Sequence, residues 1–539
     1  IDAPTAGTTV HCTVTEISSA TTAKYDANPA VVPLPLNGAG EKTYRIEYYT
    51  DGKGFTATPV STIYYRVVLT YRVTLMVEGG VGGTLKGTYR AKEENTSGTT
   101  EVKLENIPYG SSITFTAEPA AGYAVDSWTG VTATPPNNTT ATLSNITGDV
   151  TVMVKFKINV ITIDGASADA WKQLKEAVRN APAEGIITIH GTIKATNADG
   201  NNGAIEVTKK ITIQGKSGNA NTDILDANSH HSGTLPSDAP TTPHRIFTVK
   251  SGGNLTLENL TLTRGLASGS GADQNGGAIL VENTGILTIY GGIIDFNKAM
   301  YWGGGIFTLP GAHVTLGTED NSRPCTIKNN TGAHEGGGIY NQGTLAMYGG
   351  SIEVNPGVNG GGGLYIYQGV CTLNSVDIHN NLVNSGKKGS GIFLYRPPAN
   401  NASLMLTHNT KIGSSSDQNT LCLGARSSSQ SAFVTAKALD ATAHINIEPH
   451  NYGAQKNTTL VKVPNDASAA AYKEYFHLTE NGSMAEGWLL IPDDGDKELV
   501  LQKGKVVAGG GSGAWNRFKT AIQTAEAGDT IVINGTIQA

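Results

Sequence analysis

Between Gly276 and Ile392 the chain repeats one hydrophobic pattern at spacings of 27, 33, 25 and 28 residues. Each copy opens with glycines and a large aliphatic residue, and two further short stretches follow in which apolar and polar residues alternate. Alternation with a period of two is typical of β-strands buried on one face, so each copy predicts three short strands. The aliphatic residues that end the opening phrases are Ile279, Ile306, Ile339, Leu364 and Ile392.

Three short strands per repeat are the unit of a parallel β-helix. A single coil cannot bury its inward side chains, whereas stacked coils share one continuous core, and the glycines permit turns with positive φ. The sequence therefore predicts an all-β chain whose main domain is a parallel β-helix over residues 159–445. We also expect an asparagine ladder, in which amides of successive coils bond about 4.8 Å apart. Its expected members are Asn297, Asn329, Asn330, Asn355, Asn380, Asn381 and Asn409.

A helical pattern occurs twice in the chain. Trp171, Leu174, Ala177, Val178 and Ala181 lie on one face of a helix expected at about 168–181. We expect this amphipathic helix to cap the N-terminal end of the β-helix, where unpaired strand edges would otherwise be exposed.

The same helix and the strand after it recur 344 residues further on, without a gap, from Ala514 to Ala539. We interpret residues 446–505 as the closing cap of the β-helix. Residues 506–539, which include the linker Gly509–Gly513, are interpreted as the start of a second β-helix unit. On this interpretation the chain is one part of a longer array.

Residues 70–158 carry a different pattern of short strands and glycine-rich turns. Its phrases are a hairpin at 82–87, Gly122-Tyr123, Trp128-Thr129-Gly130 and a closing segment from Asn145 to Val150. These phrases resemble the divergent internalin-B-type repeat of bacterial surface proteins over about 90 residues. The resemblance implies a spacer or interaction module rather than an enzyme. Residues 1–69 are rich in threonine, and we expect a small β-rich segment there.

Composition narrows the function classes. Glycine accounts for 67 of 539 residues, charged residues for only 16%, and the formal net charge is −6. This balance gives no basic footprint for nucleic acid, and no run of about 18 apolar residues predicts a membrane span. The four cysteines have no C-x-x-C spacing, so we interpret them as buried free thiols.

The glycine-containing coils resemble those of pectin-lyase-like proteins and of polymorphic outer-membrane proteins. The resemblance spans about 260 residues and implies a right-handed parallel β-helix. Both polysaccharide enzymes and adhesins use this fold, so the resemblance does not decide the function.

Carboxylates on the β-helix face are the candidates for enzyme chemistry. Hydrolysis needs two carboxylates that flank the bond, and elimination needs Ca²⁺-binding acids beside a base. Three acids lie in the third strands of their coils, each two residues before the recurrent asparagine or its neighbour. They could form an acidic stripe along that face, but Ile327 or Lys328 interrupts it. If the protein is an enzyme, its candidate catalytic residues are Asp295, Glu353 and Asp377, with Lys387 or Lys388 nearby. We prefer to interpret them as a solvated strand face.

Metal and cofactor motifs are incomplete. His334-Glu335 begins like a zinc helix motif, but Gly336–Gly338 follow and no second histidine has the required spacing. The run Asp493–Asp496 lacks the distal glutamate of a calcium loop. We therefore predict no metal and no cofactor; calcium is conceivable at this run but unsupported.

Recognition is expected at the segments that precede the glycine phrases, because they vary from coil to coil on a rigid scaffold. Tyr301 and Trp302, with His334 and Glu335 one coil further on, are the candidate ligand-binding residues. Aromatic rings with polar edges suit sugars or protein partners.

These features favour a non-catalytic, extracellular protein of the bacterial cell surface, an adhesin or structural stalk built from repeated β-helix units. Its expected partners are a protein or glycan of a host or neighbouring cell, or copies of itself in an array. Two alternatives stay open: a polysaccharide lyase or glycoside hydrolase, and the passenger of an autotransporter whose membrane part lies outside this segment.

Overall fold

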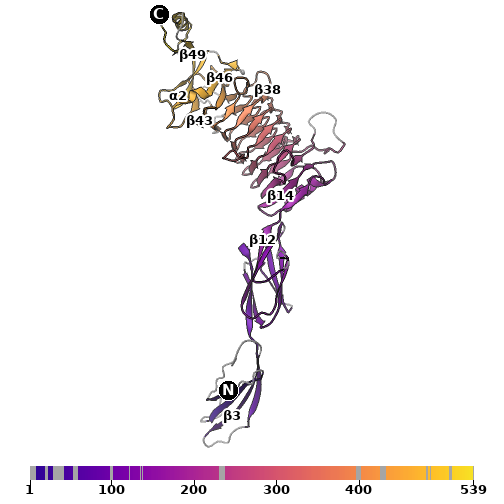
Figure 1. Ribbon diagram of the computed structural model, residues 1–539. Helices are drawn as coiled ribbons and strands as arrows, with labels where there is room; N and C mark the ends of the chain where they lie inside the picture. Colours follow the sequence, from indigo (N-terminus) through magenta and orange to yellow (C-terminus); the bar gives the residue numbers. More distant parts are fainter. Residues whose placement is uncertain are drawn as a thin grey trace. The chain divides into compact units, whose positions relative to one another are not determined.

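The computed structural model divides into two compact units, Ile1–Asn159 and Val160–Ala539 (Figure 1). It describes residues 8–537 except 18–21, 28–41, 53–58, 91, 98–100, 121, 134, 136–137, 230–236, 396–401, 425–431, 454, 481–482, 486, 509–512 and 528. Strands dominate both units, as the all-β prediction requires.

The first unit begins with a small antiparallel sheet, as expected for residues 1–69. Its strand order is β2-β1-β3-β4, and the sheet buries Val10, Val14 and Tyr44 on one face. The strands are β1 (Thr8–Glu16), β2 (Thr22–Ala27), β3 (Lys42–Gly52) and β4 (Ser61–Val67).

Two four-stranded sheets follow and share one hydrophobic core. Trp128 donates its indole N–H to Asn138 O at 2.8 Å. Gly130 has φ +80°, and a Cβ there would lie 1.9 Å from Thr151 O, so the close strand approach requires glycine. One sheet contains β5 (Thr70–Val77), β8 (Glu101–Pro108), β10 (Tyr123–Thr129) and β12 (Val150–Ile158). The other contains β6 (Gly83–Tyr89), β7 (Lys92–Asn95), β9 (Ile113–Pro119) and β11 (Thr140–Leu143).

The second unit is a parallel β-helix, as predicted (Figure 1). Its first face is built from the longer strands, which stack in parallel from β13 to β45. These strands are β13 (Ile161–Asp164), β14 (Gly185–His190), β17 (Lys210–Gly215), β20 (Asn254–Glu258), β24 (Ile286–Tyr290), β28 (His313–Leu316), β32 (Thr344–Tyr348), β36 (Val370–Asn374), β40 (Ser403–His408), β43 (Val434–Leu439) and β45 (Thr459–Lys462).

The other two faces join into one 19-stranded sheet. The second face contains β15 (Thr192–Lys194), β18 (Ile224–Asp226), β21 (Thr261–Thr263), β25 (Ile293–Asp295), β29 (Thr326–Lys328), β33 (Ser351–Glu353), β37 (Asp377–His379), β41 (Lys411–Ile412) and β44 (His444–Pro449). The third face contains β16 (Ile205–Val207), β19 (Phe247–Val249), β23 (Ile279–Val281), β27 (Ile306–Thr308), β31 (Ile339–Asn341), β35 (Leu364–Ile366), β39 (Ile392–Tyr395) and β42 (Leu421–Gly424).

A fourth strand of only two residues joins the second face to the third in the middle coils, and the sequence analysis did not predict it. These strands are β22 (Leu266–Ala267), β26 (Lys298–Ala299), β30 (Thr331–Gly332), β34 (Pro356–Gly357) and β38 (Leu382–Val383). The glycine phrases follow them. The first glycine of each phrase, such as Gly303 with φ +65° and Gly336 with φ +66°, turns the chain onto the third face.

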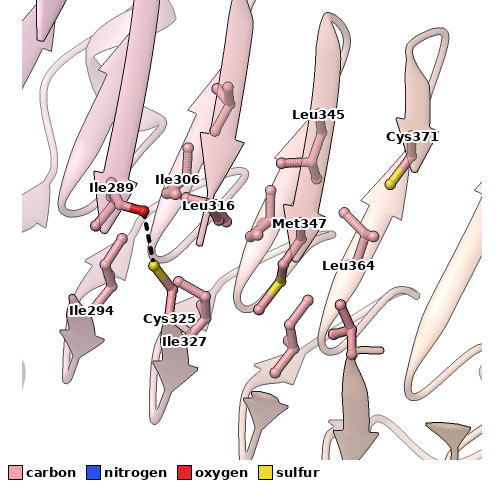
Figure 2. Packing of buried hydrophobic residues seen from close by; sticks show 14 of the residues in the cluster. Ile289, Ile294, Ile306, Leu316, Cys325, Ile327, Leu345, Met347, Leu364 and Cys371 are labelled. Atoms are coloured by element: carbon pink, nitrogen blue, oxygen red, sulfur yellow. Dashed lines mark hydrogen bonds between the residues drawn. The ribbon is translucent and has the colours of Figure 1, made fainter. Parts of the chain in front are cut away.

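Aliphatic side chains fill the interior coil by coil (Figure 2). Inward residues of the first face, such as Ile289 and Met347, meet those of the other faces, such as Ile294 and Ile306. All four cysteines are free and buried, as predicted. Cys325 donates its thiol to Ile289 O at 3.1 Å, and burial raises its pKa. The thiols therefore serve as small core side chains.

The predicted asparagine ladder is confirmed in the middle coils. Asn297, Asn330, Asn355 and Asn381 each donate Nδ2–H to the Oδ1 atom of the next member, at 2.9 to 3.0 Å. Each receiving Oδ1 also accepts the backbone N–H of the preceding member. The last member is Asn419, so the expectation for Asn409 was wrong: Asn409 precedes β41, and an extended turn after β41 places Asn419 on the ladder instead.

The closing part keeps the parallel pairing beyond residue 445. β44 pairs with β46 (Phe476–Glu480), and a short helix, α2 (Ala469–Tyr472), precedes β46. The pairing then turns antiparallel, because β49 (Glu498–Ala508) joins β45 to β48 (Trp488–Pro492). A change from parallel to antiparallel pairing ends the stack of coils here.

Both predicted amphipathic helices are present. α1 (Ala170–Asn180) lies between β13 and β14 and buries the expected face, including Trp171 and Leu174. α3 (Ala514–Gln523) lies between β49 and β50 (Thr530–Asn534), which pair in parallel. The predicted linker residues 509–512 and the last residues of the sequence repeat, 538–539, lie outside the described residues.

Candidate functional site

The four residues that we name the contact patch, Tyr301, Trp302, His334 and Glu335, lie together on neighbouring coils. The rings of Tyr301 and His334 stack with centroids 4.0 Å apart. Trp302 donates its indole N–H to Glu335 Oε2 at 2.6 Å. Backbone bonds from His334 N to Tyr301 O and from Gly303 N to Glu335 O align the two segments. Because Tyr301 is 38% exposed, the patch presents an aromatic ring to solvent.

An aromatic ladder runs along the third face beside the contact patch. It consists of Phe307, Tyr340, Tyr365 and Phe393, the second residues of β27, β31, β35 and β39, which lie in register. Successive ring centroids are 5.4, 5.1 and 5.2 Å apart, and the rings are stacked. Their strand neighbours point into the core, so these rings point outward. Burial raises the pKa of Tyr340 and of Tyr365, so both phenols stay neutral.

Trp302 joins the contact patch to this ladder. Its ring stacks on Phe307 at 6.1 Å and on Tyr340 at 5.1 Å. The sequence analysis missed the ladder, although a signal exists: a large apolar or aromatic residue follows the aliphatic residue of each glycine phrase, as in Ile306-Phe307 and Ile339-Tyr340.

A hollow of about 430 Å³, which we name the aromatic hollow, opens beside Tyr301 and Trp302. Its other walls come from a loop before β23 and from residues near β27 and β31. Amide side chains supply its polar lining, and no charged residue is among the described residues that line it. The lining residues besides Tyr301 and Trp302 are Gly271, Ala272, Gln274, Asn275, Phe307, Leu309 and Gln342.

Arg245 holds the loop of this hollow in place. Its guanidinium donates to Asp273 Oδ1 at 3.0 Å, to Ala272 O at 3.2 Å and to Asn275 O at 3.1 Å. The Arg245 side chain is only 7% exposed. A buried guanidinium with several acceptors fixes geometry well, so the loop is a preformed wall.

The candidate carboxylates lie on the second face, and none of them lines the aromatic hollow. Asp295 pairs in register with Lys328, and Lys328 with Glu353. The two acids are therefore two strands apart, about 9.6 Å, with the predicted interruption at Lys328 between them. Asp295 accepts a hydrogen bond from Asn329 at 2.8 Å, and burial raises its pKa.

Asp377 does not continue the acidic row, which corrects the sequence interpretation. It pairs with Ser351 and Lys411, so it occupies the first outward position of its strand, whereas Glu353 occupies the third and pairs with His379. His379 Nε2 lies 2.8 Å from Glu353 Oε2, and its Nδ1 lies 3.6 Å from Asp377 Oδ1. The imidazole therefore stands between the two carboxylates.

Lys387 and Lys388 line a second hollow of about 890 Å³, which we name the lysine hollow. Asp417 and Glu448 line it as well, and the sequence analysis missed both. Glu448 is buried, pairs with Lys388 Nζ at 3.1 Å and accepts a hydrogen bond from Thr420 Oγ1 at 3.2 Å. No sequence signal marks these acids, because they come from later coils that only stacking brings beside the lysines.

The acidic run at Asp493–Asp496 forms the hairpin turn between β48 and β49. Asp493 Oδ1 accepts the backbone N–H groups of Lys497 and Glu498, each at 2.7 Å. These bonds hold the pKa of Asp493 below its usual range. Within the described part of the chain, no three or more His, Cys, Asp or Glu side chains are grouped so that they could hold a metal ion.

The fold and the patch define a parallel β-helix protein with an exposed aromatic residue, Tyr301, beside buried stacked rings. Residues 73–160, nearly all of them in the first unit, match the Divergent InlB B-repeat domain family. The match confirms the resemblance predicted for 70–158 and covers that part of the chain alone. Among curated proteins, none matches the chain. No helix within the described residues is long and apolar enough to cross a membrane.

Proposed function

We propose that this chain is a non-catalytic protein of the bacterial cell surface, an adhesin in which a stiff β-helix presents the contact patch to a ligand. The observation that carries the proposal is the convergence of Tyr301 and Trp302 with the aromatic ladder at the rim of a preformed hollow. Concave sites with aromatic walls and a few polar groups are typical of ligand binding.

The first unit supports the surface location. Its InlB-type repeat is a module that suits a spacer between a cell and a recognition domain. The β-helix supports the display role, because stacked coils and the asparagine ladder form a scaffold on which variable loops can be held.

The proposal includes an array of β-helix units. The pairing of β49 with β50 repeats the register of β13 with β14, because Ile163 pairs with Ile189 and Val507 with Ile533. The apolar face of α3 leaves Trp515 40% exposed. A further coil stacked on this unit would bury Trp515 as the first coils bury Trp171.

The test of the non-catalytic role is incubation of the full chain with a panel of neutral and acidic polysaccharides, with and without Ca²⁺. Size-exclusion chromatography then measures the chain length of each polysaccharide. We expect unchanged length across the panel. Shortened polysaccharide would contradict the proposal.

A polysaccharide-cleaving enzyme is the second candidate, and the lysine hollow favours it. Asp417 and Glu448 line one hollow together with Lys387 and Lys388, which are group types that hydrolysis or elimination uses. If the panel shows cleavage, Asp417→Asn should abolish it while Asp377→Asn, outside the hollow, leaves it unchanged. Cleavage that depends on Asp377 instead would place the chemistry on the second face, beside His379.

A further inference from the structure

We infer that the aromatic hollow binds an uncharged hexose unit of a glycan, with Asn275 as its positioning hydrogen-bond donor. This inference rests on the proposed function and names the ligand class of the same site. It follows from the free donor, the aromatic walls and the lack of charge among the described residues that line the hollow.

Asn275 has a side-chain donor, Nδ2, without a hydrogen-bond acceptor among the described residues. The residue is only 5% exposed, and its Oδ1 accepts the backbone N–H of Trp302 at 3.1 Å. That bond fixes the orientation of the amide, because a backbone N–H requires an acceptor. Asn275 lines the hollow, and its Nδ2 group is not one of the buried atoms without a partner, so solvent or a ligand can reach it. A ligand hydroxyl that accepts this N–H replaces water with a hydrogen bond whose donor is already oriented.

The aromatic walls suit the apolar faces of a sugar ring. Tyr301 and Trp302 meet edge to face with ring centroids 5.0 Å apart, and Phe307 lies behind Trp302. A pyranose presents C–H groups on its faces and hydroxyls around its edge, which matches rings flanked by the amides of Gln274 and Gln342. The volume of about 430 Å³ lies in the range of small-ligand sites.

The charges around the hollow select against an acidic sugar. The guanidinium of Arg245 is already bonded to Asp273 and to the backbone carbonyls of Ala272 and Asn275 in the loop. The carboxylate of Glu335 is held by the indole N–H of Trp302. A uronate in the hollow would lose water without gaining a cation, and this desolvation is unfavourable. An uncharged hexose has no such cost.

The test uses the full chain and isothermal titration with hexasaccharides of glucose, mannose and galactose, and with oligogalacturonate as the acidic probe. We expect at least one neutral hexasaccharide to bind and oligogalacturonate not to bind. Asn275→Asp keeps the acceptor for Trp302 N but removes the donor, so it should weaken binding about tenfold or more. Tyr301→Ala should weaken it similarly, because one wall is lost.

Phe296→Ala is the matched control, since Phe296 is an exposed aromatic residue of the second face, outside the hollow. It should leave the affinity unchanged, and near-ultraviolet circular dichroism checks that each variant is folded. No binding by any neutral probe, tighter binding of oligogalacturonate, or affinity unchanged in both hollow variants would each overturn the inference. Binding followed by shortening of the probe would instead contradict the non-catalytic role and leave the ligand class intact.

Discussion

The chain contains one strand–helix–strand unit twice, and the two copies differ in what covers them. α1–β14 and α3–β50 have matching sequence, and β13 and β49 pair with them in the same register. Trp171 in α1 is 0% exposed, whereas Trp515 at the equivalent position in α3 is 40% exposed. Ile189 in β14 is also fully buried, whereas its counterpart Ile533 in β50 is largely exposed.

The difference comes from the coils that follow the first copy. Trp171 donates its indole N–H to Gly203 O at 3.0 Å, and its ring lies 5.4 Å from that of His244. Both partners belong to the first coils after α1. An amphipathic helix gains most of its stability from tertiary packing rather than from its own sequence. The helix sequence therefore specifies a cap, and the adjoining coil decides how much of that cap is buried.

The largest expected effect comes from truncating the two tryptophans in parallel. Trp171→Ala removes a fully buried side chain and should lower the free energy of unfolding of the β-helix by about 3–5 kcal/mol. Trp515→Ala should lower it by under about 1 kcal/mol, because much of that side chain is already in water. Denaturant titration followed by far-ultraviolet circular dichroism measures both. Equal losses would show that α3 is packed as tightly as α1.

The asparagine ladder should contribute to the free energy of unfolding of the β-helix. Asn330→Ala removes the Oδ1 acceptor of Asn297 and the donor to Asn355, and leaves buried polar groups unpaired. We expect a loss of about 3 kcal/mol in the same titration. Asn409→Ala is the matched control outside the ladder, and should cost about 1 kcal/mol or less, since its partner is the hydroxyl of exposed Thr442.

An Asn330→Ala loss no larger than that of the control would mean that the ladder contributes little beyond the ordinary strand pairing. The coils would then be held by the aliphatic core alone, and the difference between the covered α1 and the open α3 would be purely a matter of apolar burial.

The sequence predicts the β-helix well because its inward aliphatic residues and its glycines recur with the coil. It predicts that Tyr301 and His334 lie on adjacent coils for the same reason. It fails where the coil length changes: the extended turn after β41 places Asn419 rather than Asn409 on the ladder. It also misplaces Asp377, because strand register cannot be fixed from the distance to a neighbouring asparagine.

The two hollows could not be predicted from the sequence, because each combines residues from different coils. The aromatic hollow combines Asn275, Trp302 and Gln342 from three coils, and the lysine hollow combines Lys388 with Glu448, which lies in a later coil. Such combinations depend on which loops stack over which strands. A sequence period gives the rise from coil to coil, but it does not give the path of each loop.

Acid should loosen the covered end of the β-helix through His244, which lies against Trp171. Burial lowers the pKa of His244 below its usual value near 6.5, and the charge of Lys175 lowers it further; the backbone carbonyl of Arg245, which accepts Nδ1–H, acts in the opposite direction. The unfolded state therefore binds the proton more readily than the folded state. The stability that neutral His244 contributes is therefore present above about pH 6.5 and is lost as the pH falls below it.

The measurement is the unfolding midpoint between pH 7.5 and 5 for the parent chain and for His244→Gln, which cannot gain the proton. We expect a smaller fall with pH in the variant. His450 and His477 also have pKa values lowered by burial, so only the difference between the two proteins reports on His244. Identical pH profiles would contradict a role for His244 at the covered cap.

Replacing each tryptophan with phenylalanine is the smallest of these changes, and it reports directly on the solvent exposure of α1 and α3. Trp171→Phe and Trp515→Phe should alter stability little, but they remove different parts of the fluorescence that the five tryptophans contribute. Loss of Trp515 should remove a component that acrylamide quenches readily, because the Trp515 ring is open to solvent. Loss of Trp171 should remove a protected component, because the Trp171 ring is buried. If Trp515 is as protected as Trp171 in this chain, the apolar face of α3 is already covered, and a further coil does not pack on it. If Trp515 is quenched in this chain but protected in a longer chain that carries another coil after β50, the second cap works as the first one does.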